Sequence, residues 1–241
     1  MLSSKTRSEE TENEHDFDLF IKNLEIPKLS NEEQNLLEHD VSTEEIKNAL
    51  KRFQKNKTPG DDGFSVEFYE TFIILIGGNL LDSYNEAYQN NKLSISQRRG
   101  IISLIPKSDE NLNYITNWRP ITLLNVDYKI LARIIAMRVE PFLPNLIHPD
   151  QTGFIKGRYI GQNMHLLNDL MTYTESNKIA GTLLFIDFEK AYDTLEWRFI
   201  HRTLKTFNFV PKIRSWISIL YNDIESGVMN AGFMTDRKSV V

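Results

Sequence analysis

Residues 185–193 read FIDFEKAYD, and this stretch decides more about the fold than any other part of the chain. Residues 182–186 read TLLFI and form an apolar run directly before Asp187. This run has the length and composition of a buried strand. A carboxylate at the end of a buried strand is held rigidly, and it can bind a Mg²⁺ ion that bridges phosphate oxygens. The alternatives for Asp187 are a solvated strand end and a helix N-cap.

The composition is that of an ordinary globular protein, with 241 residues, 41% hydrophobic and 25% charged side chains. The absence of cysteine excludes disulfides and thiolate zinc sites, and the 5 histidines lack metal-ligand spacing. No apolar run reaches the roughly 18 residues of a membrane span. Because the N-terminus is polar and acidic, we expect an intracellular, soluble protein that does not contact membranes.

Charge is distributed unevenly, although the net charge is only −5. Residues 1–50 hold 13 acidic and 5 basic side chains, whereas residues 98–158 hold 9 basic and 5 acidic ones. We predict that residues 1–40 form an acidic, partly disordered leader with a short helix. The basic middle is compatible with a surface that faces phosphates, or with an ordinary solvated face.

Cap residues and apolar periodicity predict mostly helices, with strands entering later. Ser42 and Glu45 form a capping box before a helix that we expect to end near Lys57. A longer helix is expected after Ser65, broken or kinked at residues 77–78. The other expected elements are a strand at 100–106, a polar loop at 108–118, helices at 125–141, 160–173, 197–207 and 211–221, and a hairpin beginning at 228–233. This order indicates an α/β (α+β) fold.

Three further regions carry recognisable strings. The first is KTPGDDGF at residues 57–64. The second is a pair, LIPK at residues 104–107 and NWRPITLL at residues 117–124. The third is HPDQTGFIKGR at residues 148–158. With residues 187–193 they resemble, in order and spacing, the reverse transcriptases of non-LTR retrotransposons of the long interspersed type. The resemblance covers roughly residues 40–235. Asp61 is a mild departure, since the family often has proline there.

The resemblance implies a partial right-hand polymerase within residues 41–241. Helical and hairpin fingers would cover about 41–175, and the start of the palm would cover about 176–241. Asp187 would be the catalytic residue and a Mg²⁺ ligand. Tyr192 would select deoxynucleotides by blocking a ribose 2′-hydroxyl, although it can also be a core aromatic residue.

Lys107 and Arg119 flank the polar loop, so a β-hairpin would bring them together. A cationic pair of this kind can hold a triphosphate, the arginine through its planar fork and the lysine as a point charge. By resemblance, both contact the incoming nucleotide. The alternative is a pair of ordinary surface cations.

The template contacts implied by the resemblance are Gln151, Gly153, Phe154 and Arg158. Glycine lets the backbone approach phosphates, and aromatic or arginine side chains stack on bases. The alternative is a glycine-rich loop around a buried phenylalanine. Residues 57–63 can likewise be a plain helix stop.

The segments that the family carries next, a glycine- and glutamine-bearing stretch and a paired-aspartate hairpin, do not occur in the sequence. We therefore expect a C-terminally truncated fragment of an RNA-directed DNA polymerase that is inactive alone, with exposed apolar surface around residues 183–186. The full enzyme would add deoxynucleoside triphosphates to a DNA primer on an RNA template. Mg²⁺-dependent primer extension that Asp187→Ala abolishes would contradict the expected inactivity.

Two other hypotheses remain open from the sequence. One is a non-catalytic nucleic-acid-binding fingers module, or a non-functional remnant. The other is a helical scaffold protein, which would have no strand around Leu183 and no cluster of Lys107, Arg119 and Asp187.

Overall fold

The computed structural model describes residues 17–22, 24–108, 111–188, 191, 194–230, 233–235 and 238–240. The chain forms two compact units. The hairpin unit comprises residues 32–141 and 210–241, and the α7 unit comprises residues 1–31 and 142–209. Helices and strands are mixed, which confirms the predicted α/β (α+β) class. The division into a leader, fingers and palm stays a prediction.

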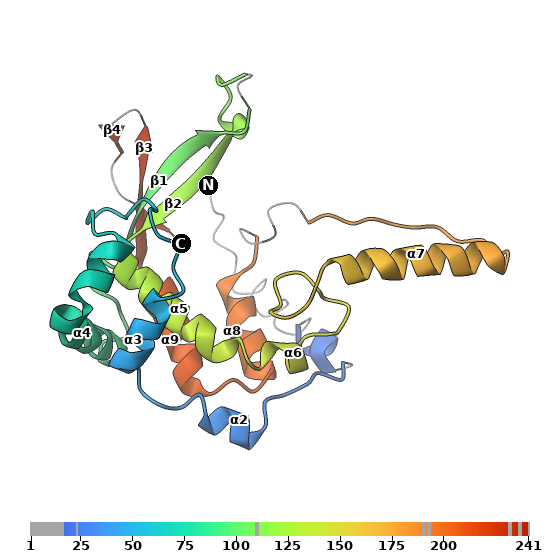
Figure 1. Cartoon of the computed structure of the whole chain (residues 1–241), viewed down its shortest axis with the longest axis horizontal. Coiled ribbons are helices and arrows are strands. Elements are labelled where there is room, and N and C mark those ends of the chain that lie inside the picture. Colours follow the sequence, from blue (N-terminus) through green and yellow to red (C-terminus); the bar gives the residue numbers. More distant parts are fainter. Residues whose placement is uncertain are drawn as a thin grey trace. The chain divides into compact units, whose positions relative to one another are not determined.

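Four helices of the hairpin unit share one hydrophobic core (Figure 1). They are α3 (Thr43–Leu50), α4 (Val66–Gln89), α5 (Val126–Val139) and α9 (Pro211–Tyr221). Each contributes apolar side chains at helical spacing, such as Ile130, Leu131 and Ile134 of α5, which are at most 1% exposed. Trp216 of α9 and Tyr84 of α4 are the largest fully buried side chains. None of the helices among the described residues is both long and apolar enough to cross a membrane.

The predicted capping box of α3 is confirmed. Glu45 N–H donates to Ser42 Oγ at 3.3 Å, and Ser42 N–H donates to Glu45 Oε2 at 3.0 Å. Two other details were wrong: α3 ends at Leu50 rather than near Lys57, and α4 runs unbroken through Gly77 and Gly78. A glycine costs a helix about 1 kcal/mol, which the buried face of α4 outweighs.

A sheet with strand order β2-β1-β3-β4 flanks the helices, and β5 pairs with β3 off this path. Its strands within the described residues are β1 (Arg99–Pro106), β2 (Trp118–Leu124), β3 (Ile224–Asn230), β4 (Phe233–Met234) and β5 (Lys238–Val240). β1 pairs antiparallel with β2 and parallel with β3, which lies about 120 residues later in the chain. The predicted hairpin at 228–233 is confirmed as β3–β4.

Two ion pairs hold β3 beside β1. Arg98, whose side chain is buried, donates from Nη1 to Asp223 at 2.6 Å. Arg99 donates from Nε to Glu225 at 2.9 Å. One contact precedes both strands and the other joins Arg99 and Glu225, the first pair of the ladder, so both stabilise the parallel register.

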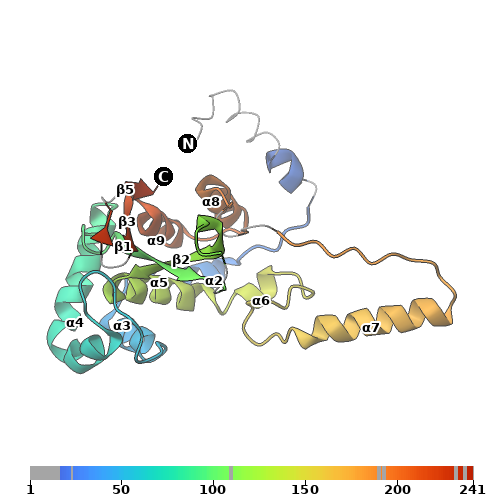
Figure 2. The same cartoon turned by 90° about the horizontal axis from the view of Figure 1, so that it is seen from above.

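The α7 unit contains α6 (Leu143–Leu146), α7 (Gly161–Ser176) and α8 (Trp197–Thr206). After α7 the chain turns and runs back in the opposite direction (Figures 1 and 2). The predicted buried strand at 182–188 was wrong: residues 181–188 form no strand and are exposed, with Leu184 at 81%. Because no described strand pairs with this segment, its backbone has no ladder to join. The expected exposure of apolar side chains at 183–186 is confirmed.

Candidate nucleotide- and template-binding site

The β1–β2 hairpin brings Lys107 and Arg119 to one end of the sheet. Arg119 pairs with Ile105, and Lys107 N–H donates to Asn117 O at 2.8 Å just beyond the last ladder pair. Strand alternation therefore puts the two cations diagonally across the same face. Both are exposed, and neither side chain has a hydrogen-bond or ion-pair partner among the described residues.

The hairpin projects away from the helical core of its unit (Figure 1). Burial falls along β1 from Gly100 and Ile101, which are buried, to Ile105 and Pro106, which are exposed. Side chains close the turn, since Trp118 Nε1 donates to Leu112 O at 3.0 Å and Asn117 Nδ2 donates to Asn111 O at 2.9 Å. The predicted hairpin is confirmed, and it holds the two cations on an accessible projection.

Asn125 joins the 57–64 string to the end of β2. Its side chain, which is 1% exposed, accepts from Asp62 N–H at 3.3 Å and donates to Ser96 O at 3.0 Å. Asn125 occupies the N-cap position of α5 but makes no side-chain cap bond, because both ends of its amide are used elsewhere. A Cβ added at Gly60 would lie 2.1 Å from Asn125 Oδ1, so this position requires glycine for close approach.

Carboxylates gather beside this junction. Burial raises the pKa of Asp127, and the nearby charge of Asp62 raises it further. Burial also raises the pKa of Asp62. Burial lowers the pKa of Lys129, which Asp62 partly counteracts. The junction therefore combines half-buried charges of both signs, whereas Lys107 and Arg119 of the hairpin are exposed.

Arg158 organises the loop that holds the predicted template contacts. Its Nη1 donates to His148 O at 2.6 Å and Gln151 O at 2.8 Å, and its Nη2 donates to Pro144 O and Ile147 O, both at 2.8 Å. These four carbonyls use the four terminal guanidinium hydrogens. Arg158 is thus a positioning residue for the loop in this structure, and a direct template contact stays a prediction.

The loop displays Phe154, which is 92% exposed and has a φ of 63°. A left-handed backbone is rare for a bulky residue, so the surrounding loop imposes this conformation. The buried phenylalanine considered from the sequence is therefore wrong. Gln151 Nε2 donates to Gly153 O at 3.3 Å, and Gln151 is exposed while Gly153 is half-buried. The arrangement suits stacking of Phe154 on a base.

An Arg158→Lys variant is expected to loosen residues 144–158 while leaving the hairpin unit intact. A lysine ammonium has three donors and cannot reproduce the guanidinium fork to four carbonyls. Limited proteolysis should cut this loop at least about tenfold faster than in the wild type, corresponding to the loss of about 1.4 kcal/mol of local stability. Lys156→Arg, a conservative change of a basic residue in the same loop, is the control and should leave the cleavage rate unchanged. Equal cleavage of all three proteins would contradict the positioning role.

Asp187 lies in the exposed segment 181–188 of the α7 unit, whereas Lys107 and Arg119 belong to the hairpin unit. The predicted approach of this carboxylate to the two cations therefore stays a prediction. Tyr192 lies outside the described residues. Within the described part of the chain, no group of three His, Cys, Asp or Glu side chains is placed to hold a metal ion.

Comparison with known proteins decides the family. The reverse transcriptase (RNA-dependent DNA polymerase) family matches residues 105–237, which is more than half of the chain. The chain belongs to the reverse transcriptase family. The match contains Arg119, the 148–158 loop and Asp187, and it begins two residues before Lys107. Reverse transcriptases generally use divalent metal ions, nucleotides and a nucleic-acid template and primer.

The relatives are proteins of non-LTR retrotransposons, which confirms the non-LTR type. The chain is 34% identical over 200 residues to the transposon TX1 uncharacterized 149 kDa protein of Xenopus laevis, covering 83% of this chain and 15% of that protein. It is 27% identical over 174 residues to a Pol polyprotein of the type-1 retrotransposable element R2 of Popillia japonica, covering 68% and 22%. The chain thus spans less than a quarter of either relative.

The sequence did not predict that Asn125 links the 57–64 string to the end of β2. Asn125 follows the NWRPITLL string directly, at the start of the helix expected at 125–141, and no local signal connects it to the 57–64 string. Its bond to Asp62 spans 63 positions of the chain, so only the tertiary structure reveals that the two strings meet.

Proposed function

We propose that the chain forms the nucleotide- and template-binding part of an RNA-directed DNA polymerase that extends a DNA primer on an RNA template. The observation that carries the proposal is the β1–β2 hairpin with Lys107 and Arg119 on one exposed face. Cations without acidic partners among the described residues keep their charge available for a triphosphate. The exposed Phe154 loop would contact the template.

In this proposal Asp187 binds one Mg²⁺ ion, and Tyr192 excludes the ribose 2′-hydroxyl. An exposed carboxylate is a hard oxygen ligand that suits Mg²⁺. The ion would neutralise charge on the transferring phosphate, while the cations of the hairpin hold the triphosphate in place. Because one carboxylate cannot hold a two-metal site, further ligands are required for catalysis.

A Lys107→Ala/Arg119→Ala variant is expected to bind a deoxynucleoside triphosphate at least about tenfold more weakly than the wild type. A hydrogen bond to a charged group contributes about 1.5–3 kcal/mol, so the loss of two such groups exceeds a factor of ten. The measurement is equilibrium binding of a labelled triphosphate in the presence of Mg²⁺ and a primer annealed to an RNA template.

The matched control is Lys47→Ala/Lys51→Ala, which removes the same charge from the exposed surface of α3 and its C-cap. It should stay within about twofold of the wild type, since surface charges far from a ligand are screened by salt. Equal weakening by both double variants would show that the hairpin is not the triphosphate site.

A further inference from the structure

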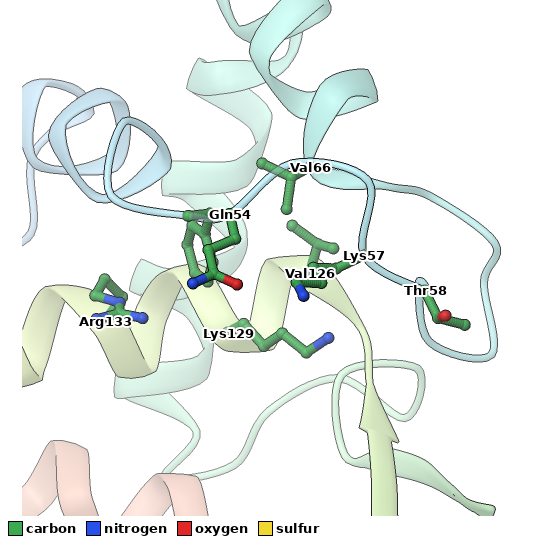
Figure 3. Close-up of a pocket in the computed structure, with 8 residues that line it drawn as sticks. Gln54, Lys57, Thr58, Val66, Val126, Lys129 and Arg133 are labelled. Atoms are coloured by element: carbon green, nitrogen blue, oxygen red, sulfur yellow. The ribbon is translucent and has the colours of Figure 1, made fainter.

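The hairpin unit contains a pocket of about 230 Å³ between α5 and the segment that follows α3 (Figure 3). Its apolar part consists of Phe53, Val66 and Val126, and its charged part consists of Lys57, Lys129 and Arg133. Val126, Lys129 and Arg133 lie at positions i, i+3 and i+7 of α5, so they share one face of the helix.

The pocket lining is positively charged, and Asp62, which lies outside the lining, offsets only part of the effect of burial on the pKa of Lys129. No carboxylate lines it, and none of its three cations forms an ion pair within the part of the chain that the structure describes. The two neighbouring cations outside the pocket behave differently, since Arg52 pairs with Glu140 at 2.8 Å and Lys55 pairs with Glu70 at 2.9 Å. Among the described residues, the cations that line the pocket therefore lack the ion pairs that these two neighbours make.

The apolar side chains of the lining include two that are buried and one that packs against a cation. Val66 and Val126 are 6% and 2% exposed, and Arg133 Cζ lies 5.2 Å from the centre of the Phe53 ring. Lys129 is half-buried, and this burial lowers the pKa of its ammonium group. A bound anion would compensate the desolvated charge of Lys129, because an opposite charge favours the protonated form.

We propose that this pocket binds one nucleotide unit of a nucleic-acid strand, with a phosphate on Lys57, Lys129 and Arg133 and the base or sugar against Phe53 and Val126. This inference rests on the proposed function, and it adds a second binding site apart from the hairpin. The pocket is smaller than the roughly 300 Å³ at which sites begin to enclose drug-sized ligands. It therefore suits a single phosphate with its attached group, rather than several nucleotides.

The test compares a Lys57→Gln/Lys129→Gln/Arg133→Gln variant with the wild type. Glutamine keeps an apolar stem and a helix propensity close to those of lysine and arginine, so the fold should survive. Binding of a single-stranded RNA oligonucleotide is measured by fluorescence anisotropy over a range of salt concentrations. The slope of log K against log salt should become shallower by about 0.7 for each phosphate that the variant no longer neutralises.

The matched control is Lys47→Gln/Lys51→Gln/Lys55→Gln, which removes the same charge from residues outside the pocket lining. It should keep the wild-type salt slope. Acetylation of the unmodified protein supplies a test without substitutions: bound RNA should protect Lys57 and Lys129 from acetylation at least about fivefold, and it should leave Lys47 reactive.

The outcomes separate this inference from the proposed function. If the pocket variant keeps the wild-type salt slope and RNA does not protect the two lysines, the pocket is not a nucleic-acid site. The proposed triphosphate site on the hairpin is unaffected by that result. Protection of Lys57 and Lys129 by RNA but not by a free nucleoside monophosphate supports binding of a nucleic-acid strand in the pocket. Protection by the monophosphate alone overturns the proposal, because the pocket would then bind a free nucleotide. Loss of triphosphate binding in the hairpin variant, together with wild-type RNA binding whose salt slope the pocket variant leaves unchanged, overturns the pocket alone. Absence of RNA binding by the wild type overturns both the pocket and the template-binding part of the proposed function.

Discussion

An Arg138→Ala variant is expected to unfold with a free energy about 3–5 kcal/mol below that of the wild type, because it breaks a buried ion pair. The Arg138 side chain is 4% exposed and donates to both oxygens of Glu45 at 2.7 and 2.8 Å. It also donates to the backbone oxygens of His39 and Asp40 at 2.8 and 2.9 Å. Urea unfolding followed by circular dichroism measures the loss.

The control is Arg52→Ala, which removes an arginine from an exposed pair with Glu140. Exposed pairs contribute about 0–1 kcal/mol, so this variant should unfold close to the wild type. Similar losses in the two variants would show that Arg138 does not stabilise the hairpin unit through its buried contacts.

The effect of Arg138→Ala should shrink in acid. Burial acts to raise the pKa of Glu45, but the bonds from Arg138 and Ser42 outweigh burial and hold this pKa below the ordinary value of 4.5. A depressed carboxyl pKa stabilises the fold above the ordinary value, and the stabilisation is lost as pH falls through the folded-state pKa. The difference between the two proteins should therefore be largest near neutral pH and decrease below about pH 4.5.

A Gly60→Ala variant is expected to detach residues 57–64 from the end of β2 and to cost about 3 kcal/mol, the upper range for overpacking. The new Cβ would lie 2.1 Å from Asn125 Oδ1, 2.5 Å from Asn125 N and 2.6 Å from Leu124 C. The last two atoms belong to the backbone and cannot rotate away. Hydrogen exchange of the Asp62 amide, which donates to Asn125, should accelerate together with the loss in urea stability.

Gly78→Ala is the matched control for this substitution. Gly78 lies in α4, and a Cβ there meets no atom within 4 Å. Alanine is favoured over glycine in a helix interior by about 0.8–1.0 kcal/mol, so this variant should be as stable as the wild type or more so. If Gly60→Ala behaved in the same way, the close approach to Asn125 would not constrain the loop.

Local signals in the sequence were enough for elements whose partners lie nearby in the chain. The Ser42–Glu45 capping box, the helix after Asn125 and the hairpin around residues 108–118 all depend on contacts within about 20 positions. The segment 182–188 shows the opposite case. Its apolar composition predicted a buried strand, but a strand requires a paired neighbour, and the structure shows none there among the described residues.

The sequence by itself determined the family, the α/β (α+β) class and the hairpin that carries Lys107 and Arg119, because motif order and short-range periodicity are written along the chain. Only the tertiary structure decided that Asn125 joins two distant strings, that Arg158 is committed to four backbone carbonyls, and that three cations surround a pocket on α5. The physical reason is that burial and hydrogen-bond partners depend on which surfaces meet, and residues far apart in the chain supply those surfaces.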